Sequence, residues 1–107
     1  MAEAAFYSAA LLALPGAALA DPDSSRQKNL IYLLVQDCGS CHGMTLKGGL
    51  GPPLLPDSLE GKNADDLADI IINGIPGTPM PPWAFEISLQ DAIWLAQRMK
   101  EGIPRDR

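Results

Sequence analysis

The two cysteines and the single histidine of this chain lie within one run of five residues, Cys38-Gly-Ser-Cys41-His42. A chain of 107 residues forms at most one small domain. The core of so small a domain seldom contributes more than about 3–5 kcal/mol unless a disulfide, a metal or a large apolar cofactor adds to it. We therefore expect this cluster to account for both the chemistry of the protein and much of its stability.

Four interpretations of the cluster place different demands on the rest of the chain. A thioredoxin-like dithiol follows a buried strand and precedes a βαβ pattern, whereas residues 30–37 favour a helix. A zinc site needs about four ligands, and the chain offers three in a tight run. A disulfide between Cys38 and Cys41 closes a very small loop, gains little entropy and leaves His42 without a role.

Covalent attachment of haem accounts for all three residues, because C-x-x-C-H is the attachment signature of c-type haem. Two thiols at this spacing match the two vinyl groups at one edge of a porphyrin, and the histidine that follows is placed to bind the iron. His42 has no rival as the proximal ligand, since the chain contains no other histidine. The motif favours one haem c held by Cys38 and Cys41, with the dithiol, zinc and disulfide interpretations as alternatives.

The chain has no second histidine, so ligation of the iron by two histidines is ruled out. The methionines are the remaining candidates for the second axial ligand. Met44 lies two residues after His42 and is tethered to the same side of the ring, and Met99 has the helical spacing of a core residue. Met80 lies in GIPGTPMPPW, residues 74–83, with prolines on both sides. We expect Met80 to bind the iron; the alternative is a partly buried loop methionine beside an open iron site.

Ligation by imidazole and thioether predicts an electron carrier and not an enzyme. A thioether is a soft, neutral ligand that favours Fe(II) and raises the reduction potential. Iron with six ligands has no vacant position for a substrate, so its chemistry is restricted to single electrons. If Met80 is labile, a haem-based ligand-binding or enzymatic protein is expected instead.

Residues 1–20 have most of the features of a secretory signal peptide. Residues 9–20, AALLALPGAALA, form an uncharged apolar run that is too short to cross a bilayer and typical of the apolar region of such a signal. An A-x-A site ends at Ala20, so we expect a monohaem domain over residues 21–107, exported to the periplasm without stable membrane insertion. The beginning of the chain carries Glu3 and no lysine or arginine, which is unusual. The alternative is a retained anchor that makes the chain a haem subunit of a membrane-bound electron-transfer complex.

Local patterns predict an all-α fold of about three helices joined by loops rich in proline and glycine. The first helix should begin at a cap on Asp23 or Ser24 and end near Asp37, at the haem motif. Its apolar stripe is Leu30, Ile31, Leu34 and Cys38. Residues 43–61 read as a wrapped loop in which Leu54, Leu55 and Leu59 cover the edge of the ring.

The two later helices have clear start and stop signals. Residues 64–73 follow a cap at Asn63 and stop at Gly74, with Leu67, Ile70 and Ile71 as the expected buried face. The last helix should start at a capping box on Ser88, run to about Glu101 and stop at Gly102. Ile93, Trp94, Ala96 and Met99 are expected to pack on the first helix.

Taken together, these motifs resemble the class I c-type cytochromes over the whole chain after residue 20. The resemblance implies a small cytochrome c fold around one covalent haem, and it gives Pro52, which follows Gly51, the carbonyl that accepts a hydrogen bond from His42. DCGSCHGMTLKGGLGPPL together with PGTPMPPW is similar to the small NirC-type cytochromes associated with the cd-type nitrite reductase of denitrifying bacteria. That likeness implies a monomeric periplasmic carrier whose partner is nitrite reductase or a protein that matures its d-type haem. A net charge of −5 agrees with such a protein and argues against nucleic acid as a partner.

Overall fold

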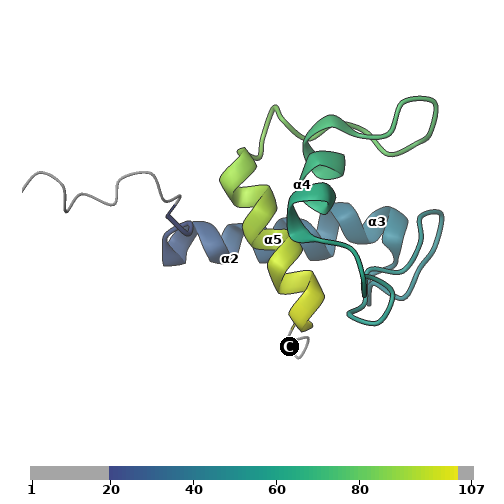
Figure 1. The fold of residues 1–107 in the computed structure, drawn as a ribbon, viewed down its shortest axis with the longest axis horizontal. Coiled ribbons are helices and arrows are strands. Elements are labelled where there is room, and N and C mark those ends of the chain that lie inside the picture. Colours follow the sequence, from purple (N-terminus) through teal and green to yellow (C-terminus); the bar gives the residue numbers. More distant parts are fainter. Residues whose placement is uncertain (1–19, 104–107) are drawn as a thin grey trace, which may run out of the picture.

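The computed structural model describes residues 20–103, which form helices and loops with no strand in that range (Figure 1). The elements are α2 (Ser24–Leu33), the π-helical turn η2 (Leu34–Cys38), α3 (Gly39–His42), α4 (Ala64–Asn73) and α5 (Leu89–Glu101). The first three are continuous and form one rod, which α4 and α5 cross side by side (Figure 1). The predicted all-α class is confirmed, whereas the predicted signal peptide lies outside the described residues except for Ala20.

The cap at the start of α2 is Asp23, one of the two predicted positions. Its carboxylate accepts a hydrogen bond from the backbone N–H of Arg26 at 2.8 Å, which satisfies one of the free N–H groups of the first turn. The inner face of the rod then enters the core through Leu30, Leu33 and Leu34.

The first helix extends further than predicted. Its expected end near Asp37 is wrong, because helical backbone continues through η2 and α3 to His42. Gly39 does not stop it, since its φ of −62° is helical, and Gly43 with φ +93° is the first residue to leave the rod. The π-turn shifts the register of the Cys-containing segment relative to α2, a feature often found at functional sites.

Helix α4 has the predicted bounds, cap and stop. The Asn63 side chain accepts a hydrogen bond from the Asp66 backbone N–H at 2.8 Å, and Gly74 ends the helix with φ +69°. The predicted burial of Ile70 is wrong, because 38% of this residue is exposed. Ile70 lies two positions from the fully buried Ala68, and so on another face of the helix. The residues that pack into or against the core follow a helical spacing: Ala64, Leu67, Ala68, Ile71 and Ile72.

Helix α5 begins with the predicted capping box. Ser88 accepts a hydrogen bond from the Asp91 backbone N–H at 3.1 Å, and the Asp91 carboxylate accepts one from the Ser88 backbone N–H at 3.2 Å. Gly102, with φ +104°, ends the helix as predicted. Its buried apolar residues are Ala92, Trp94, Leu95, Ala96 and Met99.

The main partner of α5 is α4, although its predicted contact with α2 is also present. Ala68 on α4 and both Ala92 and Ala96 on α5 are fully buried. Such small side chains allow two helix backbones to approach closely, so their positions favour tight packing of α4 against α5.

Candidate haem-binding site

Cys38, Cys41 and His42 lie at the end of the rod, on η2 and α3. All three are partly buried, and both cysteines are free thiols. Burial, and then the charge of Asp37 and the proximity of Cys41, raise the pKa of the Cys38 thiol from 9.0 to about 11. A thioredoxin-like cysteine requires the opposite shift, because only the thiolate attacks disulfides. The motif also continues a helix, where a thioredoxin-like dithiol follows a buried strand, and both observations argue against the dithiol interpretation.

The zinc interpretation lacks a donor set in the part of the chain that the structure describes. Within residues 20–103, no group of three or more His, Cys, Asp or Glu side chains gathers closely enough to hold a metal ion. The C-x-x-C-H run offers three donors, which is fewer than the four ligands of a tetrahedral structural zinc site.

The ring of His42 is oriented by the loop that follows α3. Its Nδ1 lies 2.7 Å from the carbonyl oxygen of Pro52, the residue that the resemblance implies. A carbonyl only accepts hydrogen bonds, so Nδ1 carries the proton in this pair and Nε2 has the free lone pair. A hydrogen bond of this kind sets the tautomer and ring orientation of a metal-binding histidine and raises its basicity.

Gly51 allows the loop to lie against this ring. A Cβ at position 51 would lie 2.7 Å from Cε1 and 2.8 Å from Nδ1 of His42. Both distances are shorter than side-chain contacts normally allow, so a larger residue here must displace either the ring or the loop. The Gly-Pro step thus combines space beside the ring with a carbonyl at its edge.

Backbone contacts close the rest of this loop onto α3. The N–H groups of Gly48 and Gly51 donate to the carbonyls of His42 and Cys41, each at 2.8 Å. A Cβ at Gly49 would lie 2.8 Å from the same Cys41 oxygen. Gly48 and Gly49 were not among the predicted site residues; the signal for them was the unusual density of glycine after the motif.

Met80 lies half-buried in the loop between α4 and α5, which projects beyond the upper end of α4 in Figure 1. Its backbone N–H donates to Thr78 Oγ1 at 3.2 Å, and its carbonyl accepts from the Ile75 N–H at 3.2 Å. A Cβ at Gly74 would lie 2.8 Å from this carbonyl. These short contacts within the loop hold the local backbone conformation at Met80.

Met44 and Met99 have surroundings that differ from those of Met80. Met99 is 4% exposed within the core, as predicted, and Met44 is 53% exposed. A Cβ at Gly39 would lie 3.2 Å from Met44 Sδ, so Met44 packs on α3, beside the motif. Neither has the combination of partial burial and loop anchoring found at Met80.

The leucines after the Gly-Pro step have separate locations. Leu59 belongs to the buried core, whereas Leu54 and Leu55 are partly buried. These two line a cavity of about 240 Å³ together with Thr45, Leu46, Pro56, Gly102 and Ile103. That lining includes none of the predicted site residues, and the suggested cover of a ring edge by these leucines stays a prediction.

Two aromatic arrangements were not predicted in detail. Trp83 stacks on Phe85, with ring centroids 5.5 Å apart and planes inclined by 24°, and Phe85 is 79% exposed. Trp94 is buried in the core as expected, and the Arg98 guanidinium lies 5.1 Å from its ring centroid. The W-x-F spacing of the first pair was the available signal, although neighbouring aromatic residues in a loop do not by themselves predict stacking.

A small all-α fold with one C-x-x-C-H motif, and with its histidine held by a loop carbonyl, defines a c-type cytochrome. Residues 27–97 match the family described as cytochrome c oxidase, cbb3-type, subunit III. The chain therefore belongs to the c-type cytochromes, haem proteins that carry single electrons, and within them to the group of cytochrome c55X and NirC.

The relatives that place it in this group are similar over most of their length. Cytochrome c55X of Pseudomonas aeruginosa is 54% identical over 89 residues, which are 83% of this chain and 75% of that protein. The solved structure of the c-type cytochrome NirC is 54% identical with a TM-score of 0.73, and the match covers 75% of this chain and 94% of that one.

A larger protein contains a similar domain. The structure of dihydro-heme d1 dehydrogenase NirN is 32% identical with a TM-score of 0.63. The match covers 72% of this chain and 16% of NirN. The shared part of NirN is thus a cytochrome-like domain within a much longer chain.

Proposed function

We propose that one haem c is attached through the thiols of Cys38 and Cys41, and that its iron is bound by Nε2 of His42 and the sulfur of Met80. The observation that carries this proposal is the hydrogen bond between His42 and Pro52, because it uses Nδ1 and leaves Nε2 for a metal. When bound, the haem supplies a one-electron couple between Fe(III) and Fe(II).

The residues present fit this group. Both thiols are free, and the Cys38 thiol keeps its proton at neutral pH because its pKa is about 11. Each free thiol would supply the sulfur and the hydrogen for one thioether bond to a vinyl group of the haem. Gly51 lets the loop backbone lie against the His42 ring, and the Pro52 carbonyl orients that ring.

Met80 is the proposed ligand on the second face. Its backbone N–H and carbonyl are held by Thr78 and Ile75, respectively, and the prolines around it restrict rearrangement of the loop. A neutral thioether favours the reduced iron, so this ligand raises the reduction potential. With His42 and Met80 both bound, no position is left for a substrate, which supports a carrier and not an enzyme.

The proposed location is the periplasm, after removal of residues 1–20 as a signal peptide. The apolar run over residues 9–20 and the A-x-A site before Asp21 support this. Within residues 20–103, no helix has the length and apolar character needed to cross a membrane. Mass spectrometry of the exported protein tests the proposal: a chain beginning at Asp21 plus one haem is expected, and a retained N-terminus would favour a membrane-anchored subunit.

The proposed partner is nitrite reductase or a protein that matures its d-type haem, with this chain acting as a monomeric electron donor. The relationship to NirC and to the cytochrome-like domain of a dihydro-heme d1 dehydrogenase supports a partner of this kind. Stopped-flow mixing of the reduced protein with purified nitrite reductase is the direct test. Salt-sensitive oxidation is expected, because residues 21–107 carry 8 basic and 12 acidic side chains, a net charge of −4. Oxidation no faster than that of an unrelated cytochrome would exclude this partner.

The competing function, a ligand-binding or enzymatic haem protein, has its own test. If Met80 remains bound, reduced protein does not bind carbon monoxide promptly. Immediate formation of the carbon monoxide complex in the native protein would show that the second face is open and would remove the basis for a simple carrier.

A further inference from the structure

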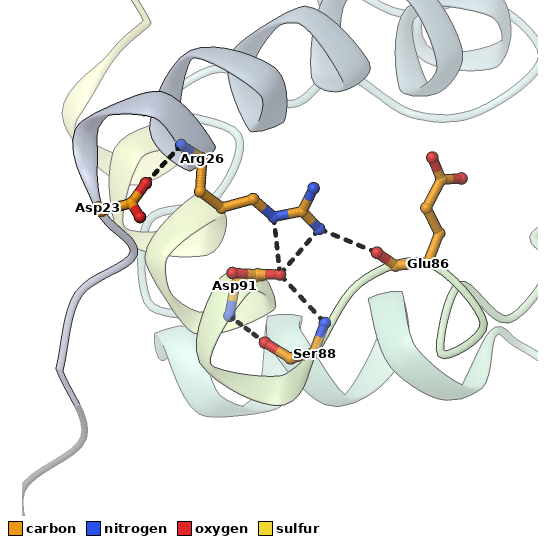
Figure 2. A network of polar contacts seen from close by, with 5 residues as sticks. All are labelled: Asp23, Arg26, Glu86, Ser88 and Asp91. Carbon is orange, nitrogen blue, oxygen red and sulfur yellow. Dashed lines mark hydrogen bonds and ion pairs between the residues drawn. The ribbon is translucent and has the colours of Figure 1, made fainter.

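Arg26, in the first turn of α2, connects that helix to two separate parts of the chain (Figure 2). Its Nε and Nη2 donate to Oδ2 of Asp91 at 3.1 and 2.9 Å. The same Nη2 also donates to the carbonyl oxygen of Glu86 at 2.9 Å. One guanidinium therefore binds a side chain of α5 and the backbone of the preceding loop.

Asp91 is well placed to hold this guanidinium. Oδ2 of Asp91 also accepts the Ser88 backbone N–H at 3.2 Å, so the carboxylate belongs to the capping box of α5. At 9% exposure it is the only charged residue that is buried in the part of the chain described here. A buried carboxylate keeps its hydrogen-bond donors, because leaving its charge without them would cost free energy.

Glu86 lies in the loop that carries Met80, close to the end of that loop. The carbonyl of Trp83 accepts from the N–H groups of Glu86 and Ile87 at 3.0 and 2.9 Å, which closes a turn. The Trp83 N–H donates to the Ile71 carbonyl on α4 at 3.0 Å. The turn after Met80 therefore has one attachment on α4 and a second, through Arg26, on α2.

We propose that Arg26 is a positioning residue for Met80, resting on the proposed function in which Met80 binds the iron. The rod begins with α2 and ends at His42. One end therefore carries Arg26, which holds the loop that contains Met80, and the other carries His42, the proposed proximal ligand. Loss of the Arg26 contacts leaves this turn attached to α4 alone, and the resulting freedom lowers the fraction of molecules in which Met80 binds the iron. Arginine is suited to this task because its planar group directs several donors at fixed angles, which a lysine ammonium does not.

The test uses holoproteins carrying Arg26→Lys and Arg26→Gln, with Glu101→Gln as the matched control. Glu101 forms an ion pair with Arg98 at 2.8 Å, and both residues lie on α5, outside the Met80 loop. Imidazole is titrated into the ferric proteins, because it binds iron only when Met80 has left. Unfolding in urea is followed in parallel by circular dichroism, and the reduction potential is measured.

Both Arg26 variants are expected to bind imidazole about tenfold more tightly than the native protein, equivalent to about 1.4 kcal/mol. Their reduction potentials should fall, and Glu101→Gln should match the native protein in both measurements. Unchanged imidazole affinity and potential in both Arg26 variants overturn the proposal, even if their free energy of unfolding falls, because that result describes a purely structural clamp.

Met80→Ala separates this proposal from the function on which it rests. If Met80→Ala binds imidazole much more tightly while the Arg26 variants do not, Met80 is the ligand and only the role of Arg26 is rejected. If Met80→Ala has the native affinity and potential, the ligand assignment itself is wrong and the positioning role is rejected with it.

Discussion

Nδ1 of His42 lies 2.7 Å from the carbonyl oxygen of Pro52, so the imidazole is oriented by backbone and not by a side chain. A substitution of the Pro52 side chain leaves this acceptor in the chain. The sensitive position is instead Gly51, whose missing side chain creates the space that the ring occupies.

Gly51→Ala is expected to displace the His42 ring. A Cβ at 2.7 Å from Cε1 requires movement of the ring or the loop, which weakens the hydrogen bond to Pro52. Because that bond raises the basicity of the imidazole, the reduction potential should shift and less haem should be incorporated. Spectroelectrochemistry and the ratio of haem to protein measure the two effects.

Gly61→Ala is the control for this substitution. Gly61, unlike Gly51, has a positive φ of +83°, and a Cβ there meets nothing within 4 Å. The cost of the left-handed conformation is about 1–2 kcal/mol of stability, with no change in potential. A native potential in Gly51→Ala would contradict the orienting role of the Gly51-Pro52 step.

Met80→Ala should retain covalent haem, lower the reduction potential and open the iron to carbon monoxide. Removing a neutral soft ligand destabilises Fe(II), and axial ligands as a whole span about 0.8 V. The weak long-wavelength absorption of the sulfur–iron bond should also disappear. Met44→Ala, at an exposed methionine beside the motif, should leave the spectrum and potential unchanged; an effect there and none at position 80 would reverse the assignment.

Stability in acid should depend on Asp91. Burial raises the pKa of its carboxyl, but hydrogen bonds from Arg26 and Ser88 and the charge of Arg26 outweigh this effect, so the pKa lies below its ordinary value of 3.8. The folded protein thus binds this proton less readily than the unfolded chain does. The contribution is complete above the ordinary value and is lost as the pH falls through the folded pKa.

Urea unfolding of the native protein and of Asp91→Asn between about pH 2 and 7 measures this contribution. Arg26 is the charged group that contacts Asp91, so the variant should be less stable near neutral pH and should lose less stability in acid. Parallel pH profiles for the two proteins would show that Asp91 does not provide this dependence.

Ala96→Leu should destabilise the protein by about 1–3 kcal/mol, because overpacking forces strained rotamers or backbone shifts. Ala96 is fully buried on α5, which packs mainly on α4. Ala84→Leu provides a control in the exposed loop before α5 and should have little effect. Equal unfolding free energies for the two variants would argue against close packing of these helices.

The caps at Asn63 and Ser88 and the glycine stops at 74 and 102 were predictable because each interaction closes within a few residues. The C-x-x-C-H run was likewise predictable as a haem-attachment motif, since its spacing is set by the cofactor that it attaches. Because these interactions are local, the sequence alone predicts the helices, the fold class and the candidate haem-binding residues.

Other features depend on how distant segments pack. The exposure of Ile70 follows from which face of α4 meets the core, and the Arg26–Asp91 pair joins positions 65 residues apart. The extension of the first helix through a π-turn to His42 also escaped prediction. Sequence alone determined the limits of α4 and α5 and the chemistry available at the motif. The tertiary structure decided which faces are buried and which charges meet, because both depend on contacts between segments that no local pattern brings together.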